Sequence, residues 1–255
     1  MSTEALTIGR ALVSIHASAD ALAEAAAAQA VEAIRAALAT RGTANVMLAT
    51  GNSQLAFLAE LVRLDVEWSA VRAFHMDEYV GMSPGHAASF QRYMRDRVAA
   101  VVTLGAFHYL YGDAPDPQVE AERYAALLVD HPLDLCVLGV GENGHLAFND
   151  PPVADFDDPL AVKVVALDEL CRRQQVGEGH FASFADVPTR AITVTIPALL
   201  AARRVIAIVP EARKAGPVRA ALRGPVTTAC PASILRTRGD VSIHLDTASA
   251  ARLER

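Results

Sequence analysis

The sequence predicts an α/β fold, in which a mostly parallel β-sheet is covered by helices on both faces. Short apolar runs typical of buried strands alternate along the chain with segments of helical periodicity. Hydrophobic residues make up 52% of the 255 residues and charged residues 20%, a balance that supplies a large core and excludes a disordered chain. No linker-like or repeated segment interrupts the alternation. We therefore expect one Rossmann-like domain over residues 1–255.

The elements follow from the same patterns. A long Ala-rich helix is expected over 17–40, ending at Arg41-Gly42-Thr43, and strands and helices alternate after it. The expected strands cover 46–49, 71–76, 135–140, 162–167, 192–196, 205–209 and 241–245. The expected helices cover 53–64, 87–101, 117–130, 198–203, 211–222 and 231–235. The loop over 149–160, rich in Pro and acidic residues, is the best candidate for an excursion or a lid.

Charge and composition narrow the partners. The 23 Lys and Arg against 29 Asp and Glu give a net charge of -6, which argues against nucleic acid because such a surface is basic and clustered. No stretch approaches the ~20 apolar residues of a membrane span, and no signal peptide is apparent, so we expect no membrane partner and a cytoplasmic location. Cys136, Cys171 and Cys230 form no CxxC pair. We expect reduced thiols, with neither a disulfide framework nor a metal site.

Ligands of open parallel sheets bind beyond the carboxyl ends of the strands, so the residues after each strand are the candidates. Thr50, Gly51, Asn52 and Ser53 follow the strand 46–49 and precede a helix. A Gly-containing turn at a helix N-terminus offers free N–H groups to an anion such as phosphate. An ordinary helix cap by Asn52 or Ser53 is the alternative. Neither GxGxxG nor GxxxxGK[ST] is present, which disfavours a nucleotide.

Two acid–base candidates follow the next strands. Asp77 comes directly after the strand 71–76 and is a candidate general base, although a solvated carboxylate at a strand end is the alternative. His145 follows a glycine-rich turn after the strand 135–140, where an imidazole can act as acid or base near neutral pH. Asp150, five residues on, can hold the other ring nitrogen. A purely structural histidine is the alternative.

A cation completes the set. Only two lysines occur, Lys163 and Lys214, and every other basic side chain of fixed charge is arginine. Lys214 lies just past the strand 205–209, where its ammonium group can neutralise a phosphate as a point charge. A solvated helix residue is the alternative.

Together these segments resemble the glucosamine-6-phosphate deaminase (isomerase) family. The matching stretches are LATGNSQLAFLAEL (48–61), FHMDEYVGMSPGHAASFQRYM (74–94), DLCVLGVGENGHLAFNDPP (134–152) and, more loosely, VIAIVPEARKAGPVRAALRGPV (205–226). The same superfamily includes 6-phosphogluconolactonases and sugar-phosphate sensor domains. The lactonase pattern looks more like GxDGHxxSLFP, so the residues 147–150, AFND, favour the deaminase branch.

The resemblance implies a role for each matched acid–base residue. Asp77 corresponds to the base that moves a proton between C2 and C1 of the sugar, and His145 to the residue that opens the pyranose ring. Asn143 and Asp150 stand where the family often has Asp and Glu supporting that histidine. Both are departures: Asn143 cannot titrate, and Asp150 is one methylene shorter than Glu.

The resemblance also implies a phosphate site. The turn of Thr50, Gly51, Asn52 and Ser53 matches the family's phosphate turn, and Lys214 matches a phosphate-binding lysine. The family's phosphate-binding arginine is expected near 172–180, where the sequence CRRQQVGEGHF (171–181) does not align cleanly. The candidates there are Arg172 and Arg173.

From this resemblance we expect an amino-sugar-phosphate deaminase/isomerase that needs no metal or redox cofactor. Its substrate would be glucosamine 6-phosphate or galactosamine 6-phosphate, converted with water to a ketose 6-phosphate and ammonia, and the sequence leaves the epimer open. The partner is thus a small sugar phosphate, with a homo-oligomer possible. Two alternatives remain: a sugar-phosphate lactone hydrolase in which His145 activates water, and a non-catalytic sugar-phosphate sensor.

Overall fold

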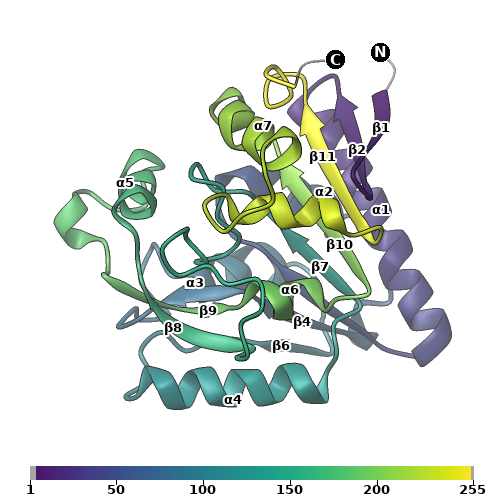
Figure 1. The fold of residues 1–255 in the computed structure, drawn as a ribbon. Helices are drawn as coiled ribbons and strands as arrows, with labels where there is room; N and C mark the ends of the chain where they lie inside the picture. Colours follow the sequence, from purple (N-terminus) through teal and green to yellow (C-terminus); the bar gives the residue numbers. More distant parts are fainter. Residues whose placement is uncertain (1–3, 254–255) are drawn as a thin grey trace.

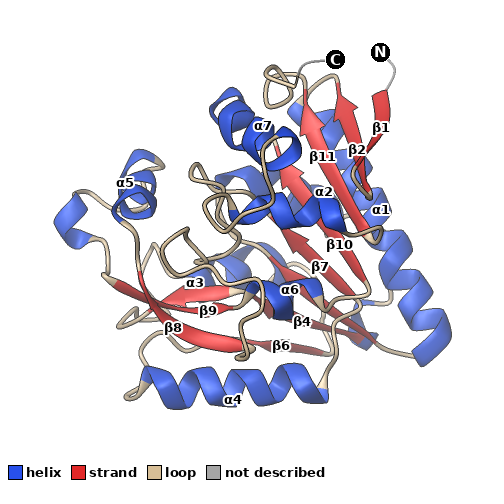
Figure 2. Cartoon of the chain, in the orientation of Figure 1, coloured by secondary structure: helices blue, strands red, loops and turns tan. Residues whose placement is uncertain are grey.

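The computed structural model describes residues 4–253, and it confirms the predicted α/β fold with a mostly parallel sheet (Figures 1 and 2). The main sheet has the strand order β1-β2-β11-β10-β7-β3-β4-β6, and only the pair β1–β2 is antiparallel. Its strands are β1 (Glu4–Ile8), β2 (Ala11–His16), β3 (Ala44–Leu48), β4 (Val71–His75), β6 (Ala106–His108), β7 (Leu135–Leu138), β10 (Arg204–Val209) and β11 (Val241–Asp246).

Helices cover both faces of this sheet. They are α1 (Ala19–Arg41), α2 (Leu55–Leu61), α3 (Phe90–Met94), α4 (Pro117–Asp130), α5 (Glu169–Gly177), α6 (Ile196–Leu200) and α7 (Ala215–Arg223). Figure 1 shows α1 and α7 on opposite sides of the sheet. The alternation of side chains along β3 explains this layering, because Val46 and Leu48 pack with α1 and α2 while Met47 packs in the core that contains α6 and α7. A strand buried on both faces therefore reads as an unbroken apolar run.

The order of the strands creates a switch point. From β3 the chain winds outward through β4 to β6, and it then returns to β7 on the other side of β3 and continues to β10 and β11. The turns after β3 and β7 consequently leave the sheet side by side at its carboxyl edge. Crevices at such switch points are where ligands of open α/β sheets bind.

The predicted strands 162–167 and 192–196 form β8 (Val162–Ala166) and β9 (Arg190–Val194), and these lie in a second sheet. That sheet has the order β5-β9-β8, is antiparallel, and begins with β5 (Asp77–Tyr79) directly after β4. It packs on its own core of Tyr79, Phe148 and neighbouring apolar side chains. Figure 1 places it beside α4, away from β1 and β2. It carries Asp77 at its first position.

Some boundaries differ from the predicted ones for local reasons. The helix expected over 87–101 begins only at Phe90, where Ser89 caps it, and it widens into a π-helical turn over 95–99. The helix expected over 211–222 starts with a 3₁₀ turn over 212–214, and the one over 231–235 is a 3₁₀ helix over 231–237. The β1–β2 hairpin, the three-residue strands β5 and β6, and the polar helix α5 were not expected.

Two further expectations concern the chain as a whole. Among residues 4–253, none of the helices has the length and apolar character needed to cross a membrane. The three cysteines are buried and unpaired, as expected.

Candidate functional site

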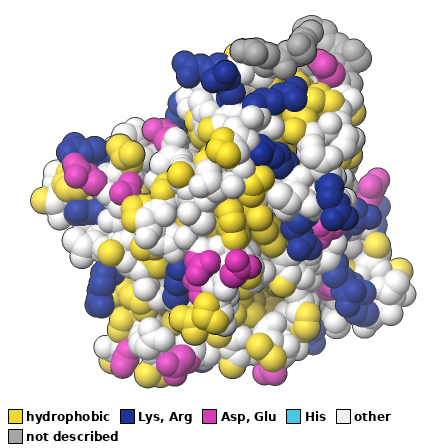
Figure 3. Space-filling view, viewed as in Figure 1, with side chains coloured by type: hydrophobic (Ala, Val, Ile, Leu, Met, Phe, Trp, Pro, Cys, Tyr) yellow, Lys and Arg dark blue, Asp and Glu magenta, His cyan; other side chains and the backbone are white. Residues whose placement is uncertain are grey.

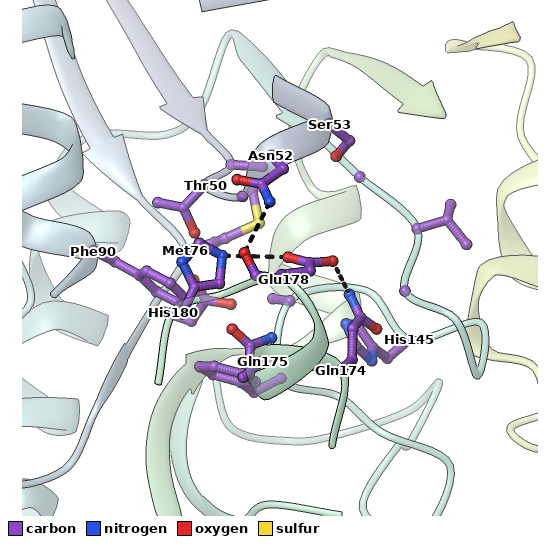
Figure 4. Close-up of a pocket in the computed structure, with 18 of the residues that line it drawn as sticks. Thr50, Asn52, Ser53, Met76, Phe90, His145, Gln174, Gln175, Glu178 and His180 are labelled. Carbon is purple, nitrogen blue, oxygen red and sulfur yellow. Dashed lines mark hydrogen bonds and ion pairs between the residues drawn. The ribbon is translucent and has the colours of Figure 1, made fainter. Parts of the chain in front are cut away.

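One cavity opens at the carboxyl edge of β3, β4 and β7, with an empty volume of about 600 Å³ that includes its mouth (Figure 4). Volumes of this size suit small-molecule ligands. Asp77, His145 and Lys214 all line it, together with the turn of residues 50–53. Three side chains separated by up to 137 positions in the sequence (214 − 77) thus meet at one hollow, as the sequence predicted.

The turn after β3 leaves its backbone open to the cavity. Gly51 has φ 101° and ψ 166°, a conformation that is essentially restricted to glycine, and no atom lies within 4 Å of where a Cβ would stand. Neither Asn52 nor Ser53 caps the helix that follows, so the alternative of an ordinary side-chain cap is not what the structure shows. The hydroxyl of Tyr93 donates to the carbonyl of Gly51 at 2.9 Å and fixes the turn from behind.

The carboxyl group of Asp77 is buried at the wall of the cavity, with 5% of the residue exposed. Its Oδ1 atom has no hydrogen-bond partner among the described residues. Burial raises the pKa of Asp77 well above its ordinary value, and the negative charges of Glu78 and Asp150 raise it further. The alternative of a solvated carboxylate is therefore wrong. A buried carboxyl with a raised pKa and no partner, facing a cavity, suits proton transfer.

The imidazole of His145 is held from behind by Asp150. Its Nδ1 lies 2.8 Å from Asp150 Oδ1, so the shorter aspartate does reach the ring. The side-chain amide of Asn143 donates to the same oxygen at 2.8 Å, and the backbone N–H of His145 donates to Asn143 Oδ1 at 3.1 Å. Asn143 and Asp150 thus orient His145 without lining the cavity themselves. This arrangement leaves Nε2 as the ring nitrogen available for chemistry.

Asp150 is ionised despite its burial. Burial alone would raise the pKa of Asp150, but the close contact with His145, the charge of His145 and the hydrogen bond from Asn143 hold that pKa below its ordinary value. An ionised carboxylate 2.8 Å from Nδ1 favours a proton on Nδ1, although the two atoms are not aligned as a hydrogen bond in this structure.

Gly141 makes room for the histidine ring. A Cβ at this position would lie 2.2 Å from Cε1 and 2.3 Å from Nε2 of His145, far inside van der Waals contact. The glycine-rich turn after β7 therefore sets the position of the imidazole directly.

Lys214 brings a buried cation to the same cavity, with only 3% of the residue exposed. Burial lowers the pKa of Lys214, and the neighbouring Arg213 lowers it further, while Glu178, Glu142 and Glu211 oppose both effects. No hydrogen bond or ion pair within residues 4–253 involves its ammonium group. A buried cation without a partner is a receptive place for an anion.

The chain is strained just before this lysine. Glu211 has φ 83°, a left-handed conformation that is unusual for a residue with a side chain. The backbone N–H of Glu211 donates a hydrogen bond of 3.1 Å to Asp246 Oδ2, which holds Glu211 in this conformation. Backbone strain of this kind persists where the surrounding structure enforces it, commonly beside functional sites.

The structure does not bring Arg172 and Arg173 to the cavity. Arg172 donates to the carbonyl groups of Phe184 and Val187 at 3.0 and 2.8 Å and stacks on the Phe184 ring. Arg173 pairs with Glu169 on the surface. Because both guanidinium groups are engaged in these contacts outside the cavity, neither arginine can bind a phosphate there in this structure.

Other side chains of the same segment line the cavity instead. They are Gln174, Gln175, Glu178 and His180. Sequence reasoning missed them, although the run of polar residues over 174–180 was a usable signal. The loop 149–160, the expected lid, contributes no lining residue.

Among the described residues, one cluster has metal-ligand chemistry: His145, Asp150 and Cys171 bring one ligand atom each within 4.8 Å of one another. The Nδ1 atom of His145 and Oδ1 of Asp150 are at hydrogen-bond distance, and the thiol is buried with a pKa that burial raises well above its ordinary value. Metal-binding thiols are thiolates. The geometry therefore favours a close contact between the His145 ring and the Asp150 carboxylate, which Asn143 also holds by a hydrogen bond, over a metal site.

The fold and the cavity together define an α/β protein that binds a small ligand at the switch point of a parallel sheet. The chain belongs to the glucosamine-6-phosphate isomerases/6-phosphogluconolactonase family, whose model matches residues 17–243. It is 35% identical to a glucosamine-6-phosphate deaminase of Listeria innocua over 215 residues, which cover 84% of this chain and 90% of that one. A second deaminase, of Exiguobacterium sibiricum, is 36% identical over 206 residues, covering 81% and 80%.

Solved structures agree with this placement. A monomeric glucosamine-6-phosphate deaminase superposes with a TM-score of 0.85 at 28% identity, covering 94% of this chain and 99% of that one. A 6-phosphogluconolactonase of Trypanosoma brucei has a TM-score of 0.77 at 21% identity, covering 97% and 100%, and this likeness concerns the fold alone.

Proposed function

We propose that the protein converts a 2-amino-2-deoxyhexose 6-phosphate and water to a ketose 6-phosphate and ammonia. The observation that carries the proposal is the meeting of an unpaired carboxyl group, an oriented imidazole and an unpaired ammonium group at one cavity. The relatives named glucosamine-6-phosphate deaminase support the amino sugar as the substrate class.

The geometry assigns each residue a task in this reaction. The turn of residues 50–53 and the Lys214 ammonium hold the phosphate, and this fixes the other end of the sugar against the acid–base groups. The Nε2 of His145 transfers a proton to or from the ring oxygen as the pyranose opens. The carboxylate of Asp77 takes the proton from C2 and returns it at C1, which leaves an imine at C2. Water then adds to C2, and ammonia leaves from the resulting carbinolamine to give the ketose. Binding energy at the phosphate thereby promotes chemistry several bonds away.

Ammonia release tests the proposal. Purified protein is incubated with glucosamine 6-phosphate and, separately, with galactosamine 6-phosphate, and both ammonia and ketose 6-phosphate are measured. We expect the two products to form in equal amounts from at least one of the substrates. Hydrolysis of a 6-phosphogluconolactone without ammonia release from either amino sugar would favour the lactonase alternative. Tight calorimetric binding of the sugar phosphates with no turnover would favour a sensor.

Three further predictions accompany this function. We propose that residues 1–255 act as one domain in the cytoplasm, which the metabolic activity of the relatives supports. We also propose that nucleic acid is not a partner; on the face that Figure 3 shows, Lys and Arg are interspersed with Asp and Glu. A homo-oligomer stays a prediction that sedimentation can test, and the related deaminase of known structure is monomeric.

A further inference from the structure

Glu178 places a carboxylate inside the cavity that is proposed to bind a phosphate. Its side chain is 7% exposed, and Figure 4 shows it between Gln174 and His180, close to Asn52. Burial alone would raise the pKa of Glu178, but hydrogen bonds from His180, Gln174 and Arg213 lower that pKa to about 2. The group is therefore a fixed negative charge at neutral pH.

The two oxygens of Glu178 are unequally occupied. Oε1 accepts from Gln174 Nε2 at 2.8 Å and from Arg213 Nη1 at 2.7 Å, so its acceptor capacity is filled. Oε2 has only a longer contact of 3.3 Å to His180 Nε2. Oε2 therefore keeps room for a further donor. A phosphate oxygen is not a donor and carries charge of the same sign, so the group that Glu178 meets in a substrate is a donor.

Gln175 offers the complementary group. Its Oε1 accepts a hydrogen bond of 2.7 Å from the hydroxyl of Tyr79, a residue with no exposed surface. Burial raises the pKa of Tyr79 well above its ordinary value, so the phenol keeps its proton and remains the donor of this bond. The amide oxygen is thus held on the Tyr79 side, and Figure 4 shows the amide of Gln175 directed into the cavity. Its N–H groups are left for a substrate acceptor.

We propose that Gln175 and Glu178 are specificity-determining residues that bind hydroxyl groups of the sugar, the first as donor and the second as acceptor. A sugar hydroxyl can both donate and accept a hydrogen bond. Gln175 and Glu178 therefore favour a sugar whose hydroxyl groups point toward them, and they disfavour an epimer whose hydroxyl group points away. Glucosamine and galactosamine 6-phosphates differ in the orientation of one hydroxyl. The inference rests on the proposed function and deepens it, since the pair selects between the epimers that the sequence left open.

The decisive variant is Glu178→Gln, which keeps the shape and weakens the acceptor. Its matched control is Glu142→Gln, because Glu142 also pairs with Arg213, at 3.2 Å, but does not line the cavity. We expect E178Q to lower kcat/KM by at least about tenfold and to change the preference between the two amino-sugar phosphates at least about fivefold. E142Q removes a charge that also lies near Lys214 and Arg213, so its kcat/KM can fall, but its preference between the two amino-sugar phosphates should stay within about twofold of the wild type.

Binding of the ketose 6-phosphate product, measured by calorimetry, identifies the group that Glu178 contacts, because the ketose keeps the hydroxyl groups and lacks the amine. Weaker ketose binding in E178Q supports hydroxyl recognition. A loss confined to the amino sugars would mean that Glu178 binds the ammonium group, and it would overturn the inference. Equal effects of E178Q and E142Q would also overturn it, since they would show that Glu178 only holds Arg213.

Gln175→Glu is the second variant, of equal size, and it replaces the donor by an acceptor. We expect it to weaken binding of both sugar phosphates at least about tenfold. Unchanged affinity would exclude Gln175 from recognition. Wild-type turnover in the same assay tests the proposed function separately: if no ammonia is released, the function fails, and ketose binding by the variants still judges the inference.

Discussion

Asp77 and Lys214 belong to one cavity, and each is a buried ionisable group without a partner, yet their surroundings differ. At Asp77, burial and the neighbouring carboxylates all raise the pKa. At Lys214, burial and Arg213 lower the pKa, but three glutamates oppose them. Every cause acting on Asp77 thus favours the neutral carboxyl group, whereas the glutamates near Lys214 favour its charged ammonium group.

The difference matches two kinds of work. A group that exchanges a proton during turnover works best when its pKa is close to the working pH. The raised pKa of Asp77 moves this carboxyl in that direction. A group that holds an anion needs to keep its charge, and the acidic residues around Lys214 favour the charged form. A variant of Asp77 should therefore lose catalysis, whereas a variant of Lys214 should lose substrate affinity.

Asp77→Asn should have the largest effect. The amide has nearly the same shape but cannot accept the proton from C2, so ammonia release should fall about 10²- to 10⁴-fold. Calorimetry should find the ketose 6-phosphate bound about as tightly as by the wild type. Ammonia release within a few-fold of the wild type would remove Asp77 from the chemistry and end the contrast drawn here.

Gly141→Ala should come next, because its methyl group would overlap the His145 ring at 2.2 Å. Displacement of a catalytic imidazole by about 1 Å is expected to lower kcat by about 10². Gly177→Ala is the control, since no atom lies within 4 Å of a Cβ there. If both variants keep full kcat, the position of the imidazole is not limiting, and His145 has no role in the slow step.

The acid–base residues were predictable from the sequence because each stands beside a local signal, a strand end or a glycine turn. Asp77 follows an apolar strand, and His145 follows the turn 139–144. The loop 149–160, which the sequence offered as a candidate excursion or lid, contributes no residue to the cavity lining.

The recognition side could not be predicted in the same way. Gln175 lies on the mostly polar helix α5, and Glu178 lies just after it. The orientation of Glu178 depends on Arg213 and that of Gln175 on Tyr79, and both partners are distant in sequence. Arg172 was a candidate phosphate ligand because the sequence shows its positive charge. The sequence does not show that its guanidinium donates to two backbone carbonyl groups. Contacts between distant segments decide such cases, and no local pattern encodes them.

Lys214→Ala should act mainly on binding. Loss of the buried ammonium should raise KM for the sugar phosphate about 10- to 100-fold, with a smaller fall in kcat from poorer positioning. Lys163→Ala is the matched control, because the other lysine pairs with Asp158 at 2.7 Å and does not line the cavity. A fall in kcat as large as that of Asp77→Asn, with KM unchanged, would place Lys214 in the chemistry instead.

The smallest effect expected is on stability, and it links Asp77 to pH. The folded-state pKa of Asp77 lies above the ordinary value of 3.8, so the folded protein holds this proton more tightly than the unfolded chain. Its contribution to the free energy of unfolding is therefore complete below pH 3.8 and is lost, at about 1.4 kcal/mol per pH unit, until the pH passes the raised pKa. Asn at position 77 does not titrate. Asp77→Asn should thus gain stability relative to the wild type as pH rises through this window, and the gain should level off above it. Urea unfolding of both proteins from pH 4 to 9 measures the difference, and a constant difference across that range would mean that the Asp77 carboxyl keeps its ordinary pKa in the folded protein.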